Sequence, residues 1–262
     1  MDSPNVDSPN VGASSVSQTA LIAASAQIAA DVTIGHFCVI ERDVVIGAGC
    51  RIGHHVVVHA GTRIGEGVRI DDHAVLGKQP MRAAASATTD GRTQPPAEIG
   101  DGCLIGTGAI LYAGCSVAKR VLIADLATVR EEVEIGERTI IGRGVAIENR
   151  CRIGARCKFE TNAYLCAYST VADDCFFAPG VLTSNDNYLG RDPARFDHFD
   201  GVTVERGGRL GVGAVTLPGR IVRSEGVVAA AALLTGDAPR AHVVAGVPAR
   251  PFREVPDTQR LD

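Results

Sequence analysis

Aliphatic side chains recur at every sixth position through most of this chain. The repeat is clear over residues 22–76 and 99–177, and a weaker run follows over 204–234. An α-helix repeats every ~3.6 residues and a strand every ~2, so neither alone produces this spacing. A six-residue repeat instead predicts a short strand followed by a corner, and three such units close one triangular coil of eighteen residues.

Stacked coils bury a continuous column of aliphatic anchors that no single repeat could bury alone. The position four residues after most anchors carries a small side chain, and the next residue after an anchor is usually Gly or Ala, as a tight corner requires. The sequence therefore predicts an all-β parallel β-helix of about thirty hexapeptide repeats, in about ten coils. We expect a disordered tail at 1–19, the β-helix at 20–236 and a C-terminal extension at 237–262.

The composition agrees with a core of small contacts, because aromatic residues make up 4% of the chain and Trp is absent. The net charge of −4 argues against a nucleic-acid partner, which requires clustered Lys and Arg. No apolar run approaches the ~20 residues that span a bilayer, and residues 1–20 lack the basic and apolar regions of a signal peptide. We therefore expect a cytoplasmic protein without a membrane partner.

The eight cysteines are explained by the repeat. Seven of them occupy the small inward position four residues after an anchor, where Cys acts as a small buried hydrophobe, and no CxxC pair is present. These seven are Cys38, Cys50, Cys103, Cys115, Cys151, Cys157 and Cys175. Cys166 falls at a corner instead, so we expect it to be the one thiol that reacts rapidly, and we expect no metal site.

The corner residues fall into three columns, one for each edge of the prism. The first edge carries only Gly and Ala from Ala29 to Ala172, and the second edge is small except at Asp71 and Glu160. The third column, called the polar edge below, runs Ala23, Glu41, His59, Gly77, Tyr112, Arg130, Glu148, Cys166 and Ser184.

Two long interruptions of the repeat, residues 78–98 and 185–203, both leave from the polar edge. Long loops on a regular scaffold usually carry function. We therefore expect the functional site at this edge.

The segments IGHFCV, IGAGCR, IGTGAI and IGRGVA resemble the repeats of the hexapeptide-repeat acyltransferases. That resemblance implies a left-handed coil and a homotrimer, neither of which the periodicity can show. The segments ETNAY (160–164), TSNDN (183–187) and VVAGVPAR (243–250) are similar to enzymes that N-acetylate dTDP-linked 3-amino-3,6-dideoxyhexoses. The resemblance covers residues 20–255, but Thr216 replaces an expected Ile and Arg223 a corner Gly.

Acetyl-CoA is the acyl donor and a nucleotide sugar the acceptor that this resemblance implies. Related enzymes act on UDP-linked amino sugars, so the nucleotide stays open. The lipid A acyltransferases of the same family would carry a catalytic His within residues 121–130, a stretch that contains none.

Acetylation of a sugar amine requires alignment of the reactants, hydrogen bonds to the oxyanion and a proton acceptor. The candidate acceptors are Glu148, Glu160 and His198. Glu160 has no charged neighbour in its own column, whereas Glu148 lies one coil from Arg130, ~4.8 Å by strand spacing, and an ion pair between them is expected. Glu160 is therefore the leading candidate from the sequence.

The candidate substrate-binding residues lie at the polar edge, near it, or in the second interruption. Asn149 and Asn185 stand two coils apart, a spacing suited to gripping a hexose. The set is Tyr112, Arg130, Asn149, Asn162, Tyr164, Ser184, Asn185, Asp186, Asn187 and Arg191, and Tyr168 is a further candidate. By resemblance, acetyl-CoA would lie along the late coils in a groove between subunits, lined by Gly211, Pro218, Gly219, Ala229 and Ala230, with Arg250 near its phosphates.

Two other classes of protein remain open. A zinc carbonic anhydrase of this fold would use three converging histidines, and the spacing of His36, His54 and His59 imitates its ligands. The same repeat could also build a β-helix scaffold without catalysis, which failure to bind CoA would indicate.

Overall fold

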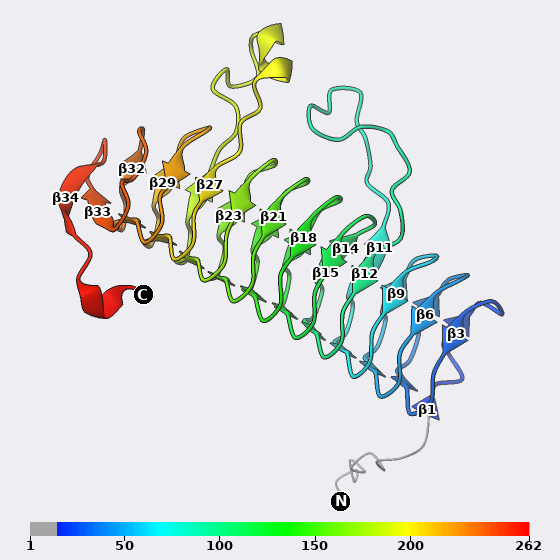
Figure 1. Cartoon of the computed structure of the whole chain (residues 1–262). Coiled ribbons are helices and arrows are strands. Elements are labelled where there is room, and N and C mark those ends of the chain that lie inside the picture. The colour runs from blue at the N-terminus through cyan, green and yellow to red at the C-terminus, as the bar shows by residue number, and fades with distance from the viewer. Residues whose placement is uncertain (1–14, 262) are drawn as a thin grey trace, which may run out of the picture.

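The computed structural model describes residues 15–261 and shows a left-handed parallel β-helix (Figure 1). Sheet A contains β1 (Ser15–Val16), β4 (Thr33–Ile34), β7 (Arg51–Ile52), β10 (Arg69–Ile70), β13 (Leu104–Ile105), β16 (Leu122–Ile123), β19 (Ile140–Ile141), β22 (Lys158–Phe159), β25 (Phe176–Phe177), β28 (Arg209–Leu210), β31 (Val227–Val228), β33 (His242–Ala245) and β34 (Arg250–Glu254).

Sheet B contains β2 (Leu21–Ile22), β5 (Val39–Ile40), β8 (Val57–Val58), β11 (Val75–Lys78), β14 (Ile110–Tyr112), β17 (Thr128–Val129), β20 (Ala146–Ile147), β23 (Tyr164–Leu165), β26 (Leu182–Thr183), β29 (Val215–Thr216) and β32 (Leu233–Leu234). Sheet C contains β3 (Gln27–Ile28), β6 (Val45–Ile46), β9 (Arg63–Ile64), β12 (Glu98–Ile99), β15 (Ser116–Val117), β18 (Glu134–Ile135), β21 (Arg152–Ile153), β24 (Thr170–Val171), β27 (Thr203–Val204) and β30 (Ile221–Val222). Two short 3₁₀ helices, η1 (Pro193–Asp197) and η2 (Asp257–Gln259), complete the described chain.

The predicted periodicity is confirmed by the register of the strands. Ile123 pairs with Ile141 in sheet A, and Ile147 pairs with Leu165 in sheet B, in each case eighteen residues further along the chain. These four anchor side chains are fully buried. The core is therefore one continuous column of aliphatic side chains inside the prism.

The stack is slightly longer than the expected ten coils, because the three sheets hold thirteen, eleven and ten strands. At the N-terminal end, β1 already pairs with β4, within the span expected as a tail; residues 1–14 lie outside the described residues. At the other end, β33 continues sheet A beside β31, and β34 turns back antiparallel to β33. The C-terminal extension thus completes the last coil and caps sheet A.

Small residues at the corners allow successive coils to approach closely. A Cβ added at Gly35 would collide with the carbonyl oxygen of Gly53, and one added at Gly136 would collide with the backbone of Gly154. The small residues predicted along the first and second edges therefore have a packing reason.

The corner position of Cys166 does not expose its thiol, contrary to the sequence-based expectation. Cys166 is 1% exposed, and its Sγ lies 3.3 Å from the Ser169 hydroxyl. The corner residue turns inward here and fills space beside Thr183, whose hydroxyl accepts a hydrogen bond from the Cys166 amide. Burial raises the pKa of the Cys166 thiol.

We expect none of the eight cysteines to react rapidly with a thiol reagent in the native protein, because all are buried and a buried neutral thiol is a poor nucleophile. Titration with a chromogenic disulfide before and after addition of denaturant measures this. Fast labelling of Cys166 in the native state would show that its corner opens.

Thr216 replaces an aliphatic anchor and is buried with 0% exposure. Its hydroxyl finds no hydrogen-bond partner within residues 15–261. A buried hydroxyl without a partner is unfavourable, so Thr216→Val should raise the free energy of unfolding by about 1 kcal/mol.

Thr139 is the matched control, because it is equally buried but donates to the Gly154 carbonyl at 2.9 Å and accepts from the Cys157 amide at 3.1 Å. Thr139→Val should lower the free energy of unfolding by about 1–2 kcal/mol. Urea denaturation of both variants and the wild type measures the difference. Equal changes in the two variants would contradict the argument from hydrogen bonding.

No helix in the described part of the chain is long and apolar enough to cross a membrane.

Candidate functional site at the polar edge

Both long loops rise from the polar edge, the corner between sheets B and C, as predicted (Figure 1). The first loop is residues 79–97, between β11 and β12, and the second loop is residues 184–202, between β26 and β27. Both project from the body of the prism on the same side (Figure 1). Within residues 15–261, the polar edge is therefore the one place where long insertions interrupt the regular coil.

Arg130 is the centre of a charged cluster on this edge. Its Nε lies 2.8 Å from Glu131 Oε2, and its terminal nitrogens lie 3.3 Å from Glu148 Oε2 and 2.9 Å from Thr89 Oγ1. The predicted ion pair between Arg130 and Glu148 is confirmed. The guanidinium also lies 4.9 Å from the Tyr112 ring centre, a cation–π contact.

The first loop folds down onto the polar edge and is held by side chains of two successive coils. Asn149 donates from Nδ2 to the Thr88 carbonyl at 2.8 Å, and Arg150 lies 2.7 Å from Asp90 Oδ2. Gln94 at the base of the loop donates to Glu132 at 3.0 Å. These contacts fix the loop against the corners.

Asn149 lies beneath the first loop, whereas its spacing from Asn185 suggested two amides open to a substrate. Asn149 is 1% exposed, and its amide nitrogen is occupied by the first loop. Asn185 donates to the Ala167 carbonyl at 3.5 Å. The two amides therefore contribute to holding the backbone.

Glu148 is the half-buried carboxylate of the cluster. Burial raises its pKa above the usual value, while the neighbouring Arg130 acts in the opposite direction. Burial and the Glu148 charge also raise the pKa of Tyr164 to about 12, so this phenol stays protonated. A carboxylate with a raised pKa is suited to accept a proton near neutral pH.

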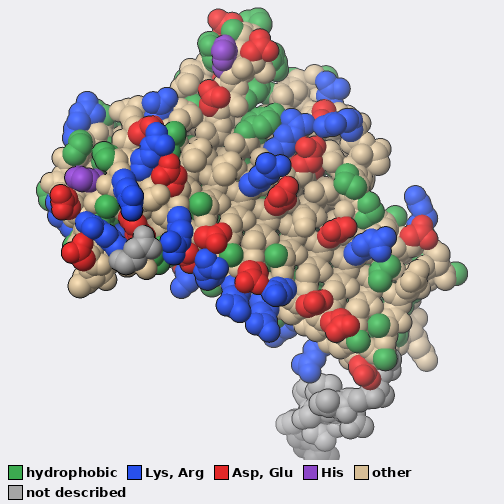
Figure 2. Space-filling view, viewed as in Figure 1, with side chains coloured by type: hydrophobic (Ala, Val, Ile, Leu, Met, Phe, Trp, Pro, Cys, Tyr) green, Lys and Arg blue, Asp and Glu red, His purple; other side chains and the backbone are tan. Residues whose placement is uncertain are grey.

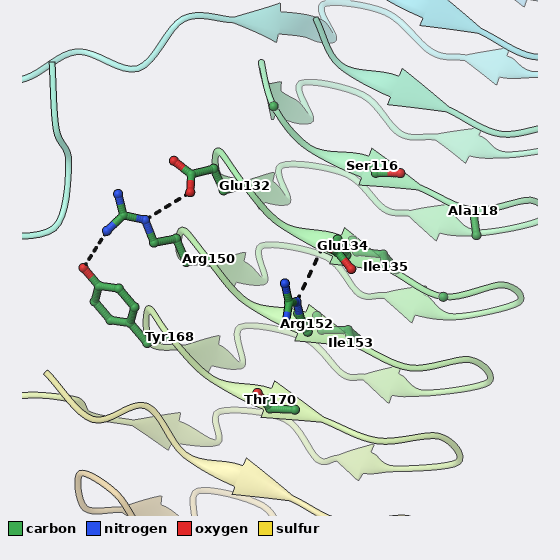
Figure 3. A pocket seen from close by; sticks show the side chains of 12 residues that line it. Ser116, Ala118, Glu132, Glu134, Ile135, Arg150, Arg152, Ile153, Tyr168 and Thr170 are labelled. Atoms are coloured by element: carbon green, nitrogen blue, oxygen red, sulfur yellow. Dashed lines mark hydrogen bonds and ion pairs between the residues drawn. The ribbon is translucent and has the colours of Figure 1, made fainter. Parts of the chain in front are cut away.

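A cavity of about 940 Å³ opens on sheet C beside the polar edge (Figure 3). Its lining includes two matched pairs, with Arg150 3.2 Å from Glu132 and Arg152 3.5 Å from Glu134. The Tyr168 hydroxyl also lies 3.0 Å from Arg150 (Figure 3). The complete lining is Gly114, Ser116, Ala118, Glu132, Glu134, Ile135, Gly136, Arg150, Arg152, Ile153, Tyr168 and Thr170.

The face that carries this cavity is polar. Figure 2 shows Lys and Arg side chains interspersed with Asp and Glu over the coils. A surface of mixed charge offers both donors and acceptors to a polar ligand, and its ion pairs at high exposure contribute little to stability.

The candidate proton acceptors are separated by the fold. Glu148 lies at the polar edge, whereas Glu160 follows β22 at the second edge, between sheets A and B. The Glu160 carboxylate makes no hydrogen bond or ion pair with any other residue that the structure describes. His198 lies exposed in the second loop with its ring 6.1 Å from that of Tyr188.

The predicted substrate-binding residues divide in the same way. Tyr112, Arg130, Ser184 and the two asparagines discussed above lie at the polar edge, and Tyr164 points outward from sheet B beside it. Asn162 lies at the second edge with Glu160, away from the cavity.

Residues of the second loop have local roles in the structure. Asp186 accepts from the amides of Tyr188 and Gly190 and pairs with Arg195 at 2.7 Å. It therefore shapes the loop, while Asn187 and Arg191 are exposed to solvent.

The residues expected to line an acetyl-CoA groove lie on different parts of the prism. Gly211, Ala229 and Ala230 lie at the second edge, whereas Pro218 and Gly219 lie at the polar edge beside the second loop. Arg250 begins β34 of sheet A. One chain alone does not bring these six residues to a single groove.

Within one chain the histidines of the zinc alternative lie on two different edges, and the zinc enzyme would need them to converge across a subunit boundary. The rings of His36 and His54 stack at 5.3 Å on the second edge, and His59 pairs with Glu41 at 3.2 Å on the polar edge. Within residues 15–261 no group of His, Cys, Asp and Glu could hold a metal ion.

The sequence analysis missed the residues that join the first loop to the coils. Asp90, Glu132 and Arg150 act together there, and Arg150 also contacts Tyr168 in the next coil, a residue that the sequence did indicate. Glu132, Arg150 and Tyr168 form a column with eighteen-residue spacing, two positions after the corner residues. The sequence alone could have revealed this column from its spacing, but it could not have revealed Asp90 as the partner in the loop.

Together these features define the chain as a hexapeptide-repeat β-helix protein with an elaborated site at one edge. The model of the bacterial transferase hexapeptide (six repeats) matches residues 25–60 and 43–78. Residues 25–78 thus match the repeat of the bacterial hexapeptide transferases. No curated protein sequence matches the chain.

Solved structures with the same fold include three UDP-N-acetylglucosamine acyltransferases. The Arabidopsis enzyme is 18% identical with a TM-score of 0.59, over 91% of this chain and 74% of that one. The Bacteroides fragilis enzyme is 20% identical with a TM-score of 0.51, over 90% and 73%. The Francisella novicida enzyme is 22% identical with a TM-score of 0.50, over 93% and 71%. At these identities the similarity shows a shared fold.

Proposed function

We propose that this protein is an acetyl-CoA-dependent N-acetyltransferase that acts on the 3-amino group of a dTDP-linked 3-amino-3,6-dideoxyhexose. The observation that carries the proposal is the half-buried Glu148 beside Arg130, on the edge from which both loops rise. The sugar nucleotide would occupy the adjacent cavity on sheet C. The fold shared with three sugar-nucleotide acyltransferases supports the same class of reaction.

Glu148 is the proton acceptor in this proposal. The amine nitrogen of the sugar attacks the thioester carbon, the C–S bond breaks, and the proton lost by nitrogen passes to the Glu148 carboxylate. The CoA thiolate leaves and is protonated in turn. Arg130 holds the carboxylate in place, and backbone N–H groups at the corners are available to the oxyanion.

A homotrimer is part of the proposal, and the outward side of sheet B supports it. The first residues of its strands point outward and none is charged in the described chain, whereas the matching positions of sheet C include Arg63, Glu98, Glu134 and Arg152. The outward residues of sheet B are Leu21, Val39, Val57, Val75, Ile110, Thr128, Ala146, Tyr164, Leu182, Val215 and Leu233. An apolar face of this extent is typical of a subunit interface.

Light scattering should give a mass of three times 27.3 kDa. Paired aspartates at Val75 and Ile110, neighbours in sheet B, should dissociate the protein, because charge on an apolar interface is unfavourable. Aspartate at Ser116 on sheet C is the control and should leave the mass unchanged. A wild-type monomer at micromolar concentration would refute the trimer.

A UDP-linked amino sugar is the second candidate acceptor. The observation in its favour is that the three structures of the same fold described above act on a UDP-linked sugar, according to their names. The reaction at Glu148 would be the same.

The test is release of free CoA thiol from acetyl-CoA in the presence of each amino sugar nucleotide. We expect the dTDP-linked 3-amino sugar to give the higher kcat/KM and an N-acetylated product by mass spectrometry. If the protein binds both sugar nucleotides but releases no CoA thiol with either of them, the proposed reaction is refuted.

A further inference from the structure

Tyr168 carries a hydroxyl hydrogen that has no partner among the residues that the structure describes. Arg150 lies 3.0 Å from the phenolic oxygen, and a guanidinium can only donate. The phenolic oxygen is therefore the acceptor in this contact, and its own hydrogen is available to another group. No second partner of this hydroxyl exists among residues 15–261, and Tyr168 lines the cavity on sheet C (Figure 3).

The position of this hydroxyl is fixed by both long loops. Arg150 is held by Asp90 of the first loop at 2.7 Å and by Glu132 at 3.2 Å. On the other side, the Tyr168 ring stacks on Phe199 of the second loop with 6.4 Å between ring centres. A chain of contacts thus runs from Asp90 through Arg150 and Tyr168 to Phe199.

The cavity beside this hydroxyl is lined by two arginines and two glutamates. Arg150 and Arg152 both line this cavity. Arg150 lies at the corner before β21, and Arg152 is the first residue of that strand. The partner of Arg152 is Glu134 at 3.5 Å, and their side chains are 74% and 64% exposed, so this pair exchanges readily for a ligand. Oxygen atoms of phosphate accept hydrogen bonds from arginine and from a phenol.

We propose that Tyr168 is a specificity-determining residue that donates a hydrogen bond to a phosphate oxygen of a nucleoside diphosphate, and that Arg150 is the positioning residue that aims it. The identity of this ligand rests on the proposed function. The hydroxyl lies beside Arg150, and Arg152 lines the same cavity, so a diphosphate bound there has two guanidinium groups and one phenol as donors.

Calorimetric titration of thymidine diphosphate, uridine diphosphate and thymidine tests the proposal. Tyr168→Phe should weaken binding of the diphosphates by about tenfold, the effect of one lost hydrogen bond to a charged group, and leave thymidine unchanged. Tyr188→Phe is the control, because Tyr188 lies in the second loop and is not among the residues that line this cavity, and it should bind both diphosphates as the wild type does.

Arg150→Lys tests whether Arg150 acts by positioning Tyr168, because it keeps the positive charge and changes the contact with the tyrosine. The double variant with Tyr168→Phe should bind the diphosphate no more weakly than the weaker single variant, because Arg150 acts through the tyrosine. Additive losses would overturn the role of Arg150, and wild-type affinity in Tyr168→Phe would overturn that of Tyr168.

The outcome is separable from that of the acetylation assay. Acetylation with unchanged affinity in Tyr168→Phe would keep the proposed function and remove this inference. Diphosphate binding that depends on Tyr168, in a protein that does not acetylate either sugar nucleotide, would keep this inference and remove the proposed function. A wild-type protein that binds neither diphosphate would remove both.

Discussion

Glu148→Gln should lower kcat by about 10²–10⁴, the range for loss of a general base, and leave the fold intact. The amide keeps the shape of the side chain but cannot take the amine proton. Arg130 retains its bond to Glu131 at 2.8 Å, so the cluster does not lose its other partner. Stopped-flow measurement of CoA thiol release gives kcat, and circular dichroism checks the fold.

The pH dependence of the wild type provides a second measure of the same group. Because burial raises the pKa of Glu148, the carboxylate becomes a base only as pH rises through that raised value. The rate should therefore increase with pH along an acid limb above the range of an ordinary glutamate, and Glu148→Gln should lack this limb.

Glu160→Gln is the informative comparison, because the sequence favoured Glu160 and the fold places it at the second edge. We expect it to retain kcat within about threefold, well short of the effect of a lost base. A large loss in Glu160→Gln with normal turnover in Glu148→Gln would reverse the assignment. His198→Asn should also retain turnover, since this ring lies exposed in the second loop.

Phe177→Ala should lower the free energy of unfolding by about 3–5 kcal/mol, as is usual for loss of a buried ring. Phe177 has 0% exposure and stacks on Phe159 with 4.2 Å between ring centres. The coil around it cannot collapse to fill the space, because the strands above and below fix its perimeter. Urea denaturation measures the change.

Phe176→Ala is the matched control on the same strand. Its ring points outward and is only half-buried, so we expect a loss of about 1 kcal/mol or less. Similar losses in the two variants would show that the inward register of this coil is wrong. Hydrogen exchange should also locate the weakening of Phe177→Ala in the neighbouring coils, because each coil contacts mainly its neighbours.

The sequence predicted the structure best at positions where the geometry of the coil requires one type of residue. The inward anchors, the small corner residues and the departure of both loops from one edge follow from a six-residue period, and the ion pair of Arg130 with Glu148 follows from stacking at eighteen residues. Cys166 shows the limit of that argument, because a corner residue can turn inward and join the core.

The site could be predicted only in part, for the same reason. The periodic residues of the polar edge were identified, including Arg130, Glu148 and Tyr112, but the contacts of Asp90 with Arg150 were not. A nineteen-residue loop has no repeat that would fix its path, so its partners depend on how it folds over the coils.

The sequence by itself therefore determined the coil, its register and the edge from which both loops leave, because the eighteen-residue period fixes which side chains stack on one another. Only the tertiary structure decided which polar side chains are engaged and which are free. It occupied Asn149 with the first loop, set Glu160 apart on another edge, and left the Tyr168 hydroxyl open to the cavity. Those outcomes depend on long-range contacts between loops and corners, and no local pattern in the chain encodes them.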